Sequence, residues 1–243
     1  MDVAVIEHLY DELLKSLADL NQVKQVVHHA FKREFEILES YDSDSLSEIV
    51  SREAFIFDNP FTGIPEKYGF RSASVEDLKR LTYWHKNSQY CWLLMSAFEK
   101  FEEFLKASYR EVNGRAGRNL NPILVHFSEN YPGIKAAERS NAFGVNLRVA
   151  VHLVEKMRHA IAHNQGTIEN PEKFVAKVIN DSGIGDNRGD HEAFVSQFIY
   201  ASKVFIVEVP ANNNLSFPLF HDQYRILVSY LISYAYLVRN EAS

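Results

Sequence analysis

The chain has few of the features that mark secreted or membrane-spanning proteins. Its single cysteine, Cys91, can form neither an internal disulfide bond nor a cysteine-based zinc site. The first residues lack the basic segment and apolar core of a signal peptide, and no apolar run approaches the ~18 residues that a membrane-spanning helix needs. We therefore expect a cytoplasmic protein that does not associate with membranes.

The chain also lacks an excess of positive charge. Its formal net charge is −6, which does not favour a protein that coats nucleic acid through bulk electrostatics. An enzyme that contacts RNA locally remains compatible with this charge, because it needs cationic groups only at its cleft. Hydrophobic residues make up 46% and charged residues 24% of the chain, so a packed core is expected rather than disorder.

Apolar residues recur at helical spacing over most of the sequence. This pattern predicts long helices over residues 3–39, 74–112 and 142–163, and a closing helix over residues 219–239. Shorter helical segments are expected over residues 43–57, 123–127 and 191–203, and another from Pro171. Ser74 and Asp77 have the spacing of a capping box, which supports a helix start at that point.

Proline and glycine are concentrated in residues 58–70, which we interpret as an irregular stretch and as the best candidate for a boundary. We expect an N-terminal helical extension over residues 1–70 and a helical domain over residues 71–243. Residues 204–209 and 215–217 flank three asparagines and predict a small β-hairpin before the last helix. The predicted fold class is therefore all-α with one minor hairpin.

The helix predicted over residues 142–163 has two chemically different sides, because each residue turns the helix by ~100°. One side forms an apolar core stripe, namely Leu147, Val151, Val154, Met157 and Ile161. The opposite side gathers polar and titratable residues, namely His152, Glu155, His159 and His163. A single histidine on a solvated face needs no explanation, but packing alone does not require three of them beside a carboxylate.

The end of this helix carries a recognisable motif. Residues 158–163 read Arg-His-Ala-Ile-Ala-His and are followed by Asn164, Gln165 and Gly166. This segment resembles the signature of HEPN domains (higher eukaryotes and prokaryotes nucleotide-binding), in which an arginine precedes a histidine by a few residues near a helix end. The resemblance covers about residues 75–240 and departs from the family at His159, where asparagine is more common.

The resemblance implies an all-helical HEPN-like bundle and, as in many members, metal-independent cleavage of RNA at a site formed across a homodimer. It implies catalytic roles for Arg158 and His163, with His159 in support, and no cofactor. Proteins of this kind often act in defence against phage or as toxins. An antitoxin or another regulatory protein is therefore an expected partner besides RNA.

The chemistry of the motif residues agrees with such a site. Arg158 and His163 are five positions apart, hence ~140° apart around a helix, so within one chain they do not readily converge on one phosphate. A two-fold axis beside the helix end would bring both copies of the motif around one cleft. Histidine can move a proton to or from a ribose 2′-hydroxyl, and arginine offers a bidentate donor to phosphate.

Two other functions compete with the ribonuclease. Glu155, His159 and His163, with His152 nearby, present metal-ligating groups, but three such turns spread over ~12 Å of helix axis and do not match a His-Glu-x-x-His zinc site. A non-catalytic helical module that partners a nucleotidyltransferase or another defence protein is the second alternative.

Further residues are weaker candidates for the site. Arg110, Arg115 and Arg118 surround a glycine-bearing loop and are candidate RNA contacts beside Asn164, although a plain solvated loop is the favoured account of them. Three acidic residues on the preceding helix, Glu99, Glu102 and Glu103, are candidates to orient a histidine. The sequence does not choose among them.

Overall fold

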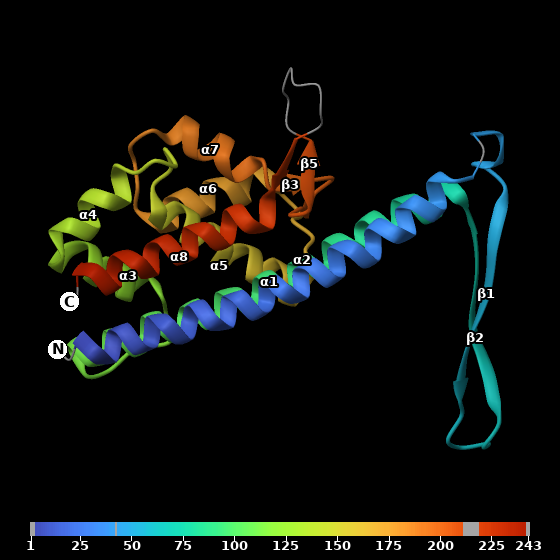
Figure 1. The fold of residues 1–243 in the computed structure, drawn as a ribbon, viewed down its shortest axis with the longest axis horizontal. Coiled ribbons are helices and arrows are strands. Elements are labelled where there is room, and N and C mark those ends of the chain that lie inside the picture. The colour runs from blue at the N-terminus through green and yellow to red at the C-terminus, as the bar shows by residue number, and fades with distance from the viewer. Residues whose placement is uncertain (1–2, 42, 211–218, 242–243) are drawn as a thin grey trace. The chain divides into compact units, whose positions relative to one another are not determined.

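The computed structural model describes residues 3–41, 43–210 and 219–241 and is predominantly helical with small antiparallel hairpins (Figure 1), which confirms the predicted fold class at that level. The helices are α1 (Val3–Glu39), α2 (Val75–Asn113), α3 (Asn121–Asn130), α4 (Pro132–Arg139), α5 (Leu147–Asn164), α6 (Pro171–Ser182), α7 (Arg188–Ser196) and α8 (Gln223–Glu241). The strands are β1 (Ile49–Asp58), β2 (Pro65–Ser74), β3 (Ile199–Tyr200), β4 (Lys203–Val204), β5 (Glu208–Pro210) and β6 (Phe220–Asp222).

The chain forms two compact units. The first contains the residues up to Lys24 and those from Ser88 onward, and the second contains Gln25–Asn87. Both α1 and α2 contribute to both units, so the division does not follow the single boundary expected at residue 70. Because the chain passes between the units inside two continuous helices, no flexible linker sequence marks the division.

Helix α5 lies at the centre of the first unit and contacts α4, α6, α7 and α8. Its residues 149–154 are all buried, so this half of the helix is covered on every side. The Asn146 side chain caps the start by accepting a hydrogen bond from the Arg148 backbone. The helix ends at Asn164, and the following residue, Gln165, adopts a left-handed conformation with φ 52°.

Helices α1 and α2 pack against each other within each unit. In the first unit the rings of Tyr10 and Phe104 lie 6.2 Å apart, and in the second those of Phe35 and Tyr83 lie 6.0 Å apart. The predicted capping box at the start of α2 is confirmed. The backbone N–H of Asp77 donates to the Ser74 hydroxyl at 3.2 Å, and the Ser74 hydroxyl contacts the Asp77 carboxylate at 3.0 Å.

Strands β1 and β2 of the second unit form an antiparallel hairpin, and the helical segment predicted over residues 43–57 is wrong. Residues 58–70, expected to be irregular, include the turn and much of β2. The residues of β1 are rich in β-branched and aromatic side chains, which favour a strand. Gly63, at φ 69°, allows the turn to close. The first seventy residues are therefore not a purely helical extension.

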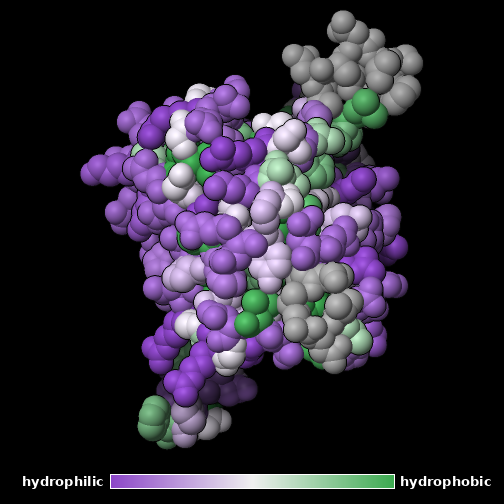
Figure 2. Space-filling model, turned by 90° about the vertical axis from the view of Figure 1, so that its left-hand side faces the viewer, coloured by the Kyte–Doolittle hydropathy of each residue, from purple (hydrophilic) through white to green (hydrophobic). Residues whose placement is uncertain are grey.

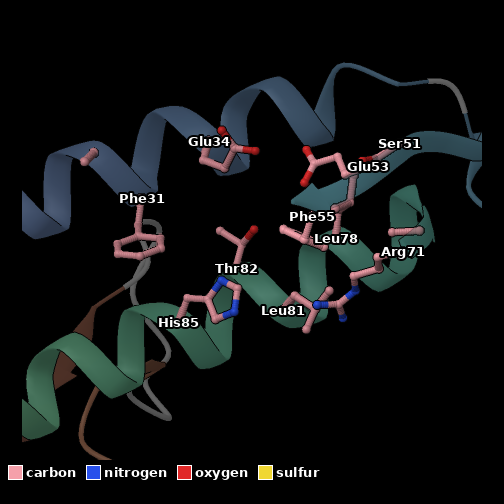
Figure 3. A pocket seen from close by; sticks show the side chains of 12 residues that line it. Phe31, Glu34, Ser51, Glu53, Phe55, Arg71, Leu78, Leu81, Thr82 and His85 are labelled. Atoms are coloured by element: carbon pink, nitrogen blue, oxygen red, sulfur yellow. The ribbon is translucent and has the colours of Figure 1, made fainter. Parts of the chain in front are cut away.

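A groove lies between the hairpin and the two helices of the second unit, with a volume of about 570 Å³. Figure 3 shows Ser51, Glu53 and Phe55 of β1 lining it. Phe31 of α1 and Leu81 of α2 line it from the helices. These contacts establish which face of β1 is turned toward the helices.

The C-terminal part of the first unit agrees only partly with the prediction. Strand β5 pairs with β6, so a hairpin precedes the last helix, but the expected second strand at residues 215–217 lies outside the described residues. Helix α8 begins at Gln223, and α6 begins at Pro171 as expected. The helix expected over residues 191–203 ends at Ser196, because the β3–β4 turn follows, with Ala201 and Ser202 at positive φ. Helix α4 was not predicted.

No helix among the described residues is long and apolar enough to cross a membrane. Figure 2 views the molecule from the side that carries the two chain ends, and this face is mainly hydrophilic. The large exposed apolar side chains belong mostly to the second unit, where the hairpin carries Phe55, Ile56, Phe57, Phe61, Ile64, Tyr68 and Phe70.

Candidate functional site

The motif histidines lie where α5 emerges from the core. His159 and His163 are exposed, whereas Met157 and Ile161 of the same turns are buried. Residues four apart on a helix lie one above the other, and the two imidazole rings are 4.6 Å apart between centroids. The structure therefore places both predicted histidines together and open to a ligand.

Arg158 is half-buried and turns toward α2 rather than toward His163. Its guanidinium lies 3.6 Å from the Glu99 carboxylate and 3.8 Å from that of Glu102, and 5.9 Å from the centre of the Phe98 ring. Among the acidic candidates of α2, Glu99 and Glu102 thus contact the motif arginine and not a histidine. Glu103 pairs with Lys100 instead.

The prediction that His152 shares the exposed polar face is wrong. Its side chain is only 1% exposed, because the first half of α5 is enclosed by neighbouring helices. Its Nδ1 lies 3.1 Å from a carboxylate oxygen of Glu155, to which it donates. His152 is therefore a core residue that holds Glu155, and the exposed cluster contains two histidines rather than three.

Glu155 and Lys156, one turn before His159 on α5, belong to a network of ion pairs. Burial alone would raise the pKa of Glu155, but the hydrogen bond from His152 and the charge of Lys156 outweigh burial and lower it. Burial would lower the pKa of Lys156, but its bonds to Asp181 at 2.9 Å and Glu155 at 3.3 Å raise it. Lys156 thus already forms ion pairs with two carboxylates, and it is poorly placed to bind another anion.

A hollow of about 310 Å³ opens beside the exposed end of α5 and is lined by residues of α5, α6 and the loop between them. His159 and Asn164 line it from α5, and Lys173 and Lys177 line it from α6. Lys173 and Lys177 are exposed and four positions apart, so their ammonium groups lie on one helix face. The sequence reasoning missed both lysines, although their spacing directly after Pro171 was a usable signal.

The remaining candidate RNA contacts lie elsewhere in the first unit. Arg110 lines a different hollow with Lys100 and Lys106, and Arg115 and Arg118 are exposed in the loop that joins α2 to α3. Asn164 is the one predicted RNA contact that lines the hollow beside His159.

The arrangement does not favour a metal centre on α5. Within residues 3–41, 43–210 and 219–241, no group of three His, Cys, Asp or Glu side chains is placed to hold an ion. Of the four residues weighed as ligands, His152 is buried and bonded to Glu155, which leaves His159 and His163 as an exposed pair. Structural zinc needs four ligands and catalytic zinc needs three from the protein.

No family model, curated protein or solved structure matches the chain. The case for a site therefore rests on the local geometry. That geometry contains two neighbouring, exposed imidazoles, an arginine held by two carboxylates, and an adjacent hollow with two exposed lysines.

Proposed function

We propose that the protein is a metal-independent endoribonuclease of HEPN type that acts as a homodimer. The observation that carries the proposal is the exposed His159–His163 pair at the open end of α5, beside a hollow that offers two lysines. Histidine exchanges protons near neutral pH, and cationic side chains attract the phosphates of an RNA strand. The resemblance of residues 158–163 to the HEPN signature supports the same reaction.

In the proposed reaction, a ribose 2′-hydroxyl attacks the neighbouring phosphorus. His163 accepts the proton from that hydroxyl as the new P–O2′ bond forms. The P–O5′ bond breaks, and a second imidazole, from His159 or from the other copy of the motif, gives a proton to the leaving 5′-oxygen. The products are a 2′,3′-cyclic phosphate and a 5′-hydroxyl, and no metal ion takes part.

Arg158 stabilises the negative charge that develops on the phosphate. Its two carboxylate contacts are longer than 3.5 Å and partly exposed, and such contacts are individually weak. A phosphate can therefore take one face of the guanidinium while the carboxylates and Phe98 hold its position. Because Arg158 and His163 point to different neighbours in one chain, the second copy supplies the complementary group.

Lys173, Lys177 and Asn164 bind the RNA strand outside the scissile phosphate. Their side chains converge on the hollow from two elements, and within the described part of the chain neither lysine forms an ion pair that would compete with the backbone of RNA. As part of the same proposal, the enzyme acts in the cytoplasm in a defence or toxin role, where a regulatory protein restrains it.

The decisive experiment is RNA cleavage by purified wild type in excess chelator, beside His163→Ala and Arg158→Ala. We expect both variants to lose cleavage. Matched controls are His8→Ala and Arg33→Ala, which remove exposed residues of the same types on α1 and should keep full activity. An RNA with a single 2′-deoxy substitution at the cut site should resist cleavage, because the attacking oxygen is missing.

Persistent cleavage by His163→Ala, or equal cleavage of DNA, would overturn this mechanism. If wild type cleaves no RNA while His163→Ala still disturbs cell growth as the wild type does, the non-catalytic interaction module becomes the better description.

A further inference from the structure

The β1–β2 hairpin exposes far more apolar surface than an isolated hairpin can sustain. On its outer part Phe61 is 94% exposed, Ile56 63% and Tyr68 68%. A two-stranded hairpin is at best marginally stable in water unless further strands or a helix cover it. The groove-side contacts cover only the part nearest the helices, which leaves the outer half without support.

The two edges of this hairpin differ. Strand β2 begins at Pro65 and carries Lys67, residue types that discourage pairing with a further strand. Strand β1 has neither lysine nor proline and reads Ile-Val-Ser-Arg-Glu-Ala-Phe-Ile-Phe-Asp. Among the described residues β1 pairs with β2 alone, so its outer edge presents unpaired backbone groups.

The direction of these groups follows from one bond at the turn. The backbone N–H of Asn59 donates to Ile64 across the hairpin. The register shifts between Phe55 and Ile56, where Tyr68 is the extra residue on β2, so β1 itself continues there without an inserted residue. Backbone groups alternate in direction along a strand, so those of Phe57, Phe55 and Glu53 point toward β2. The backbone groups of the residues between them point outward, namely Arg52, Ala54, Ile56 and Asp58.

An antiparallel pairing of β1 with a second β1 must set outward-pointing residues opposite one another. The two-fold axis then coincides with a residue position, and each position gives one register. An axis at Phe55 places Arg52 opposite the partner's Asp58, twice by symmetry. An axis at Glu53 places this residue opposite the partner's Glu53, which carries a like charge. An axis at Ala54 or at Ile56 leaves Arg52 and Asp58 opposite apolar residues.

The same register also pairs some of the apolar side chains. Phe55 meets the partner's Phe55, and Ile56 lies opposite the partner's Ala54 on the other face. Phe57 lies opposite the partner's Glu53. Phe55 and Phe57 already contact Tyr68, with ring centroids 6.1 and 6.3 Å apart. Arg52 and Asp58 are exposed and form no ion pair within the described chain, so both are available to a partner.

We propose that the outer edge of β1 pairs antiparallel with β1 of a second copy of this chain, around a two-fold axis at Phe55, to form a four-stranded sheet. Backbone hydrogen bonds between the edges supply affinity, and the two Arg52–Asp58 pairs fix the register. This interface is independent of the ribonuclease proposal, since it involves residues of the second unit alone.

Disulfide trapping in the full chain tests the register directly. Phe55 forms a non-hydrogen-bonded pair with itself across the axis, with Cα atoms ~4.5 Å apart, which is within disulfide reach. We expect Phe55→Cys to form a covalent dimer under mild oxidation. Phe57→Cys is the matched control, since Phe55 and Phe57 are 38% and 43% exposed. Its two copies would lie ~13 Å apart and should not cross-link.

Equal cross-linking of the two variants, or none by Phe55→Cys, overturns the proposal. A mixture of Ala54→Cys and Ile56→Cys chains provides a second trap that leaves the groove residue Phe55 in place, and it should give a mixed disulfide. The native Cys91 does not compete, because burial raises the pKa of its thiol to about 12.

Charge reversal tests what fixes the register. Asp58→Arg sets Arg52 opposite a like charge, and we expect it to lower the rate of cross-linking at position 55 about tenfold. Adding Arg52→Asp to the same chain restores opposite charges and should restore the rate. Failure of this rescue overturns the register. Repeating the trap with His163→Ala separates the two proposals, because loss of RNA cleavage should leave cross-linking unchanged.

Discussion

The two compact units differ in how far their apolar side chains are buried. In the first unit, the six residues 149–154 of α5 are buried on all sides, and reactive groups lie where the helix emerges. In the second unit, the hairpin carries its aromatic residues outside. The first unit can complete its core from its own chain, whereas the hairpin needs further surface to cover it. Under the two proposals, the first region serves chemistry and the second serves association.

The largest expected effect is a loss of folding stability, which should differ between a buried residue of the first unit and an exposed residue of the hairpin. Leu153→Ala removes a fully buried side chain from α5 and should lower the free energy of unfolding by about 2–5 kcal/mol. Phe61→Ala, at the exposed turn, should change it by less than about 0.5 kcal/mol. Urea denaturation at low protein concentration measures both. A large loss from Phe61→Ala would show that the turn is covered even in the single chain.

A smaller effect is expected at the hollow beside α5. Removal of two cationic contacts in Lys173→Ala/Lys177→Ala should raise KM for RNA about tenfold and leave kcat unchanged, because neither lysine touches the reacting atoms. The slope of log affinity against log salt should fall by about 2. The control Lys15→Ala/Lys32→Ala removes the same charge from exposed positions of α1. An equal loss of affinity there would indicate non-specific attraction.

Mixing two inactive variants tests whether two copies of the chain share the proposed site of the first unit. A dimer of one Arg158→Ala chain and one His163→Ala chain retains one arginine and one histidine. If the site is shared between copies, co-expression should restore a measurable part of the cleavage that each variant alone has lost. Recovery is assayed in the mixed dimer, purified by two different tags. No recovery would place both groups of one functional site in the same chain.

The smallest predicted effect concerns the buried Glu138 of α4. Burial raises its pKa, although the hydrogen bond from Ser128 at 2.8 Å and the charge of Arg148 oppose the shift. A raised pKa in the folded state means that stability is greatest while the carboxyl is protonated and falls as pH rises through the folded-state pKa. Glu138→Gln should remove this dependence. Thermal unfolding of both proteins from pH 4 to 7 should therefore diverge in favour of the variant.

The sequence predicted the parts of the fold that depend on local periodicity. The helical pattern located α2 and α5 to within a few residues, and Ser74 with Asp77 marked the start of α2. It missed the hairpin because the apolar residues of Ile49–Asp58 form two short runs, at 49–50 and 54–57, and such runs are ambiguous between helix and strand. The residues near Pro60 and Gly63 predict an irregular stretch from sequence alone, whereas they form the turn of that hairpin.

The candidate site was only partly predictable for a different reason. The spacing of His159 and His163 along α5 depends on one helix, so the sequence alone predicts that they lie together. The burial of His152 depends on which helices cover the first half of α5. The contacts of Glu99 and Glu102 with Arg158, and the approach of Lys173 to His159, depend on tertiary packing. Helical periodicity contains no information about these neighbours.

The abrupt change in α5 from a fully enclosed half to an open end has an evolutionary consequence. Substitutions at His159 or His163 alter exposed titratable groups without opening a cavity in the core, so folding imposes little selection on them. Under the proposed ribonuclease function, related chains can therefore lose cleavage at this end while the scaffold persists.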